Sequence, residues 1–293
     1  MSREPNLFLI GAPKTGTTAM AQYLSEHPQV FMSNPKELHF FNTDHRYRGI
    51  ETAKDYARVF EAADDQHRIV AEASVWYLYS EAAVKNIEAA YQNARYLIML
   101  RNPVEMAQSL HEQQVFSGLE NETDFQTAWY LQDKRRIGKC LPAIKREPKH
   151  LLYKDACSLG TQLARTLHVV PKERIHLIFN DDFRTNPKEE WTKLLAFLGV
   201  QDDRRSDFPP INSAKARKSQ FVGNIIAAIG ATRQQFGIPA MKTGILTKID
   251  RANATERLRA PIDPAFRQEL WQEFENEIRL LSKITDRDLS HWK

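Results

Sequence analysis

The sequence predicts an α/β protein in which a central parallel β-sheet carries helices on both faces. Two observations lead to this fold class. Short apolar, β-branched runs alternate with helical patterns over the first two thirds of the 293 residues,. These runs are almost continuously apolar, as expected for strands that are buried on both faces.

Five such runs are expected to form strands, at residues 6–10 (NLFLI), 68–73, 95–100, 150–153 and 174–179. The 3.6-residue pattern between them predicts helices at about 16–26, 82–92, 103–117, 124–136, 157–168 and 187–198,.

The composition changes after residue 200, where a polar and basic stretch with prolines predicts a long loop,. An apolar helix is expected near 219–236. An amphipathic helix is expected after Pro261 and Pro264,.

The net charge of +4 is a mild bias toward anionic ligands and is too weak for a dedicated nucleic-acid binder,. The N-terminus carries no basic and apolar leader, and no apolar run approaches about 18 residues. We therefore expect a cytoplasmic protein with no stable membrane insertion and no nucleic-acid partner. Cys140 and Cys157 are too few for a disulfide framework or a zinc cluster,.

The stretch Gly11-Ala-Pro-Lys-Thr-Gly-Thr-Thr18 follows the first predicted strand and opens the first predicted helix. Its glycines permit a tight turn, and the N–H groups at the start of the helix form an anion site. It nearly matches the phosphate-binding P-loop pattern, but its lysine stands at position 14 and Thr17 takes the usual lysine position,. Only Asp155 or Asp181 follows a later strand closely enough to serve as a magnesium ligand. The loop therefore favours a ligand without a long phosphate chain.

A second basic anchor follows the strand at 95–100. Arg101 comes directly after this strand, Pro103 opens the next helix, and Ser109 lies about two turns into it,. An arginine at the carboxyl end of a strand is well placed to bind a second phosphate beside the first loop. Two phosphate sites suit a 3′,5′-bisphosphate nucleotide.

Both motifs resemble those of the sulfotransferases that use 3′-phosphoadenosine 5′-phosphosulfate (PAPS) and that have a P-loop-kinase-like fold. The 5′-phosphosulfate loop of that family resembles the run Pro13, Lys14, Thr15, Gly16, Thr17 and Thr18. Its 3′-phosphate motif resembles Arg101, Asn102, Pro103 and Ser109. The resemblance implies that these residues bind the cofactor, that Lys14 stabilises the leaving phosphate, and that no metal is required.

Sulfuryl transfer to an alcohol needs a base for the hydroxyl proton, and Glu37 and His39 are the available candidates,. The segment Lys36-Glu-Leu-His-Phe-Phe41 resembles the carbohydrate sulfotransferases of heparan-sulfate type and their bacterial relatives. That resemblance implies Glu37 as general base, Lys36 as a supporting cation and His39 as a further catalytic contributor. A packed histidine is the alternative for His39.

The late loop contains three cations, Lys215, Arg217 and Lys218. A solvated charge run is one interpretation. The other is a resemblance to the family's K-G-R-type loop, which implies a catalytic Lys215 near the sulfate and cofactor binding by Arg217 and Lys218. Ala216 replaces the glycine of that motif.

We expect a single sulfotransferase domain over 1–293, with a nucleotide-binding and catalytic core at about 5–220 and a helical part at 220–293 that shapes the acceptor site. The expected reaction transfers a sulfuryl group from PAPS to a hydroxyl or an amine, with 3′-phosphoadenosine 5′-phosphate (PAP) as product. The acceptor would be a glycan, lipid or secondary metabolite. A P-loop nucleotide kinase, a non-catalytic nucleotide-binding protein and nucleic-acid binding through 215–218 stay open as alternatives.

Overall fold

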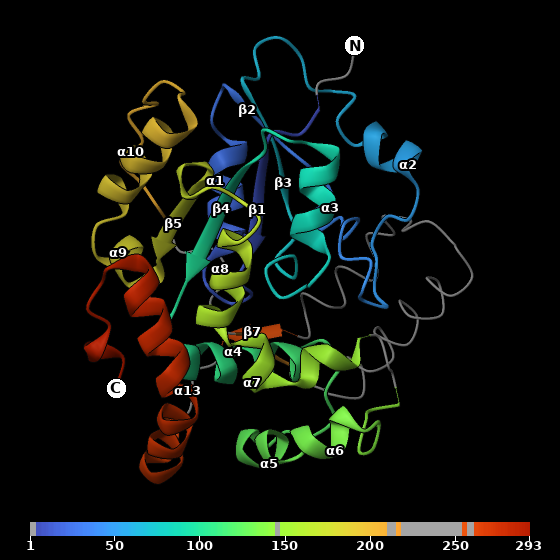
Figure 1. Ribbon diagram of the computed structural model, residues 1–293, viewed down its shortest axis with the longest axis vertical. Helices are drawn as coiled ribbons and strands as arrows, with labels where there is room; N and C mark the ends of the chain where they lie inside the picture. The colour runs from blue at the N-terminus through green and yellow to red at the C-terminus, as the bar shows by residue number, and fades with distance from the viewer. Residues whose placement is uncertain (1–3, 144–146, 210–214, 218–253, 257–260) are drawn as a thin grey trace. The chain divides into compact units, whose positions relative to one another are not determined.

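The computed structural model describes residues 4–143, 147–209, 215–217, 254–256 and 261–293 (Figure 1). Its main feature is a five-stranded sheet of order β2-β3-β1-β4-β5, in which every neighbouring pair is parallel. The strands are β1 (Leu7–Gly11), β2 (Val30–Met32), β3 (Ile69–Ala73), β4 (Arg95–Leu100) and β5 (Ile175–Phe179). The parallel α/β sheet predicted from the sequence is confirmed.

Four of the five predicted strands are present, and the strand predicted at 150–153 is wrong. Its residues lie in the 3-10 helix η1 (Pro148–Leu151) and at the start of α7 (Tyr153–Ala156). Pro148 begins the helical turn and the Glu147 side chain accepts a hydrogen bond from the Lys149 N–H, 3.3 Å away. A short buried apolar run has the same composition in a strand and in a helix, so its pattern alone could not decide.

The predicted helices correspond to α1 (Thr17–Ser25), α3 (Ala83–Ala90), α4 (Pro103–Phe116), α8 (Leu159–Leu167), α10 (Pro187–Leu198) and α13 (Pro264–Thr285). The helix expected at 124–136 is divided into α5 (Phe125–Tyr130) and α6 (Gln132–Arg136). Short elements not predicted are α2 (Ala53–Arg58), α9 (Asn180–Thr185), η2 (Lys172–Arg174) and η3 (Ser290–Trp292). The helix expected near 219–236 lies outside the described residues.

Helices cover both faces of the sheet because alternate residues of each strand point in opposite directions. Leu7 and Leu9 of β1 belong to a buried cluster with residues of α1 and α10. Phe8 points the other way, and its ring lies 6.1 Å from that of Tyr96 and 5.9 Å from that of Phe41. Figure 1 shows α3 and α8 in front of the sheet.

The described residues form two compact units. The first lies within Met1–Met106, Ser158–Ile211 and Glu275–Lys293 and holds the whole sheet. The second lies within Ala107–Cys157 and Asn212–Phe274. A single catalytic domain over the full chain stays a prediction. No helix among the residues described has the length and apolarity to cross a bilayer.

Candidate active site

The loop between β1 and α1 needs glycine at both ends. Gly11 has φ of 152°, and a Cβ there would lie 2.8 Å from the Val75 carbonyl oxygen. Gly16 has φ of 99° and is the N-cap of α1, with no side chain to accept from the first-turn N–H groups,. The loop therefore presents the positive end of the α1 dipole at the carboxyl edge of the sheet.

Hydrogen bonds from within the loop and from the first residue of α9 hold its main chain. The Thr15 hydroxyl donates to the Ala12 carbonyl at 2.7 Å, and the Asn180 side-chain amide donates to the Thr15 carbonyl at 3.0 Å. Thr15 is fully buried, so its hydroxyl shapes the loop, while Thr18 is exposed. Asn180, which follows β5, is a supporting residue that the motif patterns did not indicate.

Arg101 meets the loop directly. Its Nη1 donates to the Lys14 carbonyl oxygen at 3.1 Å, and its Nη2 forms an ion pair with Glu105 at 2.7 Å. The two predicted anion-binding motifs, 87 positions apart, thus adjoin at neighbouring strands β1 and β4. Guanidinium and ammonium groups at a helix N-terminus form an electropositive site that suits phosphate groups.

The remaining predicted cofactor residues are described only in part. Ser109 is buried and lies nearly two turns into α4. Lys215 and Arg217 belong to β6 (Lys215–Arg217), which pairs antiparallel with β7 (Ala254–Glu256), and their side chains lie outside the described part of the structure. Lys218 lies outside the described residues altogether.

The predicted base segment has no regular secondary structure, and its charged side chains lie together. The Glu37 carboxylate accepts from the Lys36 ammonium at 2.9 Å on one oxygen and pairs with His39 Nε2 at 2.8 Å on the other. The Glu37 side chain is 22% exposed, whereas that of His39 is 4% exposed. Solvent and an acceptor can therefore reach Glu37 and Lys36, which is 19% exposed, but not His39.

The neighbours of Glu37 keep its carboxyl group ionised. Burial by itself would raise the pKa of Glu37, but the hydrogen bond and charge of His39 and the charge of Lys36 outweigh it and lower this pKa to about 2,. His39 uses Nε2 for this contact, and its Nδ1 is buried without a hydrogen-bond partner. Glu37 is thus a carboxylate over the whole physiological pH range.

The segment after β3 links the phosphate loop to the base segment. The Ser74 N–H donates to the Leu9 carbonyl at 3.1 Å, and the following Val75 carbonyl passes against Gly11. On its other side, the Ser74 hydroxyl accepts from the N–H groups of Leu38 and His39, at 3.1 and 3.0 Å. One short turn thus contacts both predicted parts of the site.

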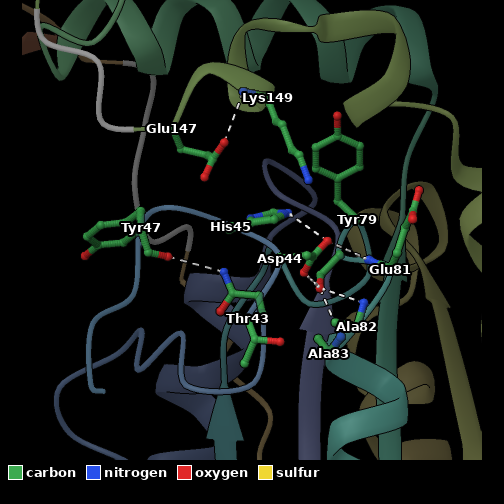
Figure 2. Close-up of polar contacts among 12 residues, drawn as sticks. Thr43, Asp44, His45, Tyr47, Tyr79, Glu81, Ala82, Ala83, Glu147 and Lys149 are labelled. Atoms are coloured by element: carbon green, nitrogen blue, oxygen red, sulfur yellow. Dashed lines mark hydrogen bonds and ion pairs between the residues drawn. The ribbon is translucent and has the colours of Figure 1, made fainter. Parts of the chain in front are cut away.

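The chain beyond the base segment is anchored at the start of α3. Asp44 accepts hydrogen bonds from the Ser80 hydroxyl and from the Glu81 N–H, the latter at 3.1 Å (Figure 2). Ser80 in turn accepts from the N–H of Ala83, the first residue of α3, at 3.0 Å. Burial would raise the pKa of Asp44, but these hydrogen bonds lower it. The residues that follow Phe41 are therefore tied to a rigid element.

The two carboxylates considered as magnesium ligands both contact protein donors. Asp181 accepts from the Trp292 indole N–H at 2.7 Å, and Asp155 pairs with Arg136 at 2.7 Å. Within the described ranges, no cluster of three or more His, Cys, Asp or Glu residues has the arrangement of a metal site.

Comparison with known proteins gives the same assignment as the motifs. The family model described as "Sulfotransferase domain" matches residues 4–208. Heparan sulfate glucosamine 3-O-sulfotransferase 5 of Mus musculus is 27% identical over 288 residues, which is 98% of this chain and 73% of the relative. The bifunctional heparan sulfate N-deacetylase/N-sulfotransferase 2 of Homo sapiens is 26% identical over 68% of this chain, but the match spans only 22% of that longer protein.

Solved structures extend the likeness to the fold. The crystal structure of a sulfotransferase from Alicyclobacillus acidocaldarius matches with a TM-score of 0.74 and 25% identity, covering 99% of both chains. Mouse sulfotransferase SULT7A1, solved with PAP, matches with a TM-score of 0.53 and 14% identity over 94% of this chain and 86% of that one. The family model matches more than half of the chain, and the matched residues include both phosphate motifs. The protein therefore belongs to the sulfotransferase family of enzymes.

Proposed function

We propose that this enzyme transfers a sulfuryl group from PAPS to a hydroxyl group of an acceptor and releases PAP. The observation that carries the proposal is the hydrogen bond from Arg101 to the Lys14 carbonyl. This hydrogen bond brings together two cationic anion-binding motifs, one after β1 and one after β4. A ligand with phosphate groups at both the 3′ and 5′ positions needs two such motifs side by side.

The donor set of the loop suits such a ligand. Thr17 and Thr18 begin α1 behind a glycine N-cap, and the Arg101 guanidinium lies against the main chain of Lys14. We assign the 5′-phosphosulfate to residues 13–18 and the 3′-phosphate to Arg101 and Ser109. PAPS supplies an activated sulfuryl group, and Lys14 stabilises the negative charge that develops on the phosphate side during transfer.

Glu37 is the proposed general base. The acceptor hydroxyl becomes strongly acidic as its oxygen bonds to sulfur, so even a carboxylate with a pKa of about 2 takes the proton at that stage,. Lys36 and His39 hold the two oxygens of Glu37 and fix its orientation. We assign further contacts with sulfate and 3′-phosphate to Lys215, Arg217 and Lys218 because of the family motif alone.

The acceptor is proposed to be a sugar hydroxyl. Two of the relatives described above are named as heparan sulfate enzymes, and one of them carries N-sulfotransferase activity in its name. An amine is therefore the second acceptor to test, followed by lipid and secondary-metabolite alcohols.

Calorimetric titration with PAP, and with ATP and magnesium in parallel, tests the donor. We expect PAP to bind and ATP with magnesium not to bind; the reverse would favour a P-loop nucleotide kinase. Labelled PAPS is then offered with a desulfated heparan sulfate oligosaccharide, a glucosamine oligosaccharide with free amines, a long-chain alcohol and a phenol. PAP binding without transfer to any acceptor would favour a non-catalytic nucleotide-binding protein.

Lys14→Ala is expected to remove most of the transfer activity, because electrostatic stabilisation of this kind is worth about 100- to 1,000-fold in kcat. Lys85→Ala, at an exposed position of α3, removes the same charge elsewhere and serves as the control. Equal rates for the two variants would contradict the assigned role of Lys14.

A further inference from the structure

A carboxylate is buried at the carboxyl end of β3, one residue before the strand ends. Glu72 has no exposed surface and accepts hydrogen bonds from the hydroxyls of Tyr56 at 2.8 Å and Ser74 at 2.6 Å. The Tyr77 hydroxyl lies beside the same carboxylate and interacts with it. A buried carboxylate is costly, so two hydroxyl donors with a third hydroxyl beside them indicate a specific arrangement,.

Two of these hydroxyls face the base segment. Ser74 Oγ accepts from the N–H groups of Leu38 and His39, at 3.1 and 3.0 Å. The Tyr77 oxygen accepts from the next two, those of Phe40 at 2.9 Å and Phe41 at 3.2 Å. The four backbone N–H groups that follow Glu37 in the sequence therefore donate to two hydroxyl oxygens.

The direction of each hydrogen bond depends on Glu72. A hydroxyl has one proton to donate and two lone pairs to accept with. Because Ser74 gives its proton to Glu72, its lone pairs point at the backbone N–H groups. The Tyr77 oxygen, beside the same carboxylate, also accepts from the segment. An amide at position 72 would face hydroxyl protons with its own N–H, and at least one hydroxyl would have to turn away from the segment.

The backbone held in this way is not in a relaxed conformation. His39 has φ of 48°, in the left-handed region that is unfavourable for a non-glycine residue,. The backbone N–H groups of His39 and its neighbours donate to the side-chain oxygens of Ser74 and Tyr77. The imidazole of His39 pairs with Glu37. The contacts with these two hydroxyls thus help to place His39 where it meets the base.

We propose that Glu72 is a positioning residue for sulfuryl transfer, acting through Ser74 and Tyr77 to hold residues 38–41 and thereby to orient Glu37. The proposal rests on the proposed function of Glu37 as base. Glu72 itself does not contact the reacting groups.

Charge supports the geometry. Burial raises the pKa of Glu72, and hydrogen bonds from Ser74, Tyr77 and Tyr56 and the charge of His39 offset only part of this rise,. The charge of His39 thus acts directly on the buried carboxylate. The buried carboxylate and the base segment are thus coupled both by hydrogen bonds and by charge.

The test compares substitutions that each remove one hydroxyl from Glu72. Ser74→Ala and Tyr77→Phe also remove the acceptors of the segment's N–H groups, whereas Tyr56→Phe loses only its bond to Glu72 and keeps its ring. All three variants keep the charge of Glu72. Glu72→Gln completes the set, and thermal unfolding identifies any variant that does not fold.

The first readout is the ¹³C titration of the Glu37 carboxyl group, which needs neither PAPS nor an acceptor. We expect no titration above pH 3 in the wild type and in Tyr56→Phe. In Ser74→Ala and Tyr77→Phe we expect the midpoint of the Glu37 titration to lie nearer pH 4, because the contacts of Glu37 with His39 and Lys36 loosen. Unchanged titration of Glu37 in both variants would overturn the proposal, whatever the enzyme transfers.

The second readout is transfer of label from PAPS to the acceptor found in the panel described above. We expect Glu72→Gln to lower kcat by about 10- to 100-fold, as misplacement of a catalytic group does, with little change in the Kd of PAP. In a Glu37→Gln background the same change should have no further effect, since both act on one step. Additive losses would overturn the positioning role, while wild-type transfer by Glu37→Gln alone would instead refute Glu37 as base.

Discussion

The contacts of Glu37 with Lys36 and His39 predict a pH-dependent contribution to stability that can be measured without a substrate. Glu37→Gln keeps the shape of the side chain and removes its charge. The pKa of Glu37 is lowered from 4.5 to about 2 in the folded protein, so the folded state holds the ionised form more strongly than the unfolded state does,. The resulting stabilisation is fully present above pH 4.5 and is lost as the pH falls through 2.

The magnitude follows from the two pKa values. A difference of 2.5 pH units corresponds to about 3 kcal/mol at pH 6, and about 1 kcal/mol of it is left at pH 3,. The free energy of unfolding of the wild type, relative to Glu37→Gln, should therefore fall by about 2 kcal/mol between pH 6 and pH 3.

Urea unfolding at several pH values between 3 and 6 measures this difference directly. Glu61→Gln, at an exposed glutamate, controls for the loss of a carboxylate as such. A difference between wild type and Glu37→Gln that stays constant from pH 6 to pH 3 would refute the claim that Lys36 and His39 hold Glu37 ionised. The base would then titrate in the ordinary range, and transfer would show an acid limb near pH 4.5.

Three further predictions concern the phosphate motifs. Gly11→Ala places a Cβ 2.8 Å from the Val75 carbonyl, and we expect a loss of about 1–3 kcal/mol in urea unfolding; Gly199→Ala, also at positive φ but with no atom within 4 Å, should lose less, and equal losses would contradict the steric reason,. Arg101→Ala should weaken PAP binding about 10- to 100-fold in calorimetry, because a hydrogen-bonded charge is worth about 1.5–3 kcal/mol. Glu105→Gln should tighten PAP binding, since Glu105 competes for the same guanidinium; unchanged affinity in both variants would place the 3′-phosphate elsewhere.

Local sequence determined much of this protein. Continuous apolar runs identify β1, β3, β4 and β5, because a strand covered on both faces can tolerate few polar residues,. The spacing of Gly11, Lys14 and Gly16 identifies the loop, since tight turns and anion binding need these residue types in this order,. The family assignment followed from such local motifs.

Other features were decided only by the tertiary structure. Residues 150–153 have strand-like composition but form helical turns, and a short buried apolar run has the same pattern in both,. Strand β2 has only three residues, and its pairing with β3 defines it more than its own pattern does.

The support of the site depends on partners that are far apart in the chain. Glu72 is an isolated charge in an apolar run, and that was a visible signal, but its role required knowing that Ser74 and Tyr77 face residues 38–41. The contact of Arg101 with the Lys14 carbonyl likewise depends on β4 lying beside β1. Local periodicity encodes which side chains are buried, whereas strand order decides which buried groups meet, and only the folded chain contains that information.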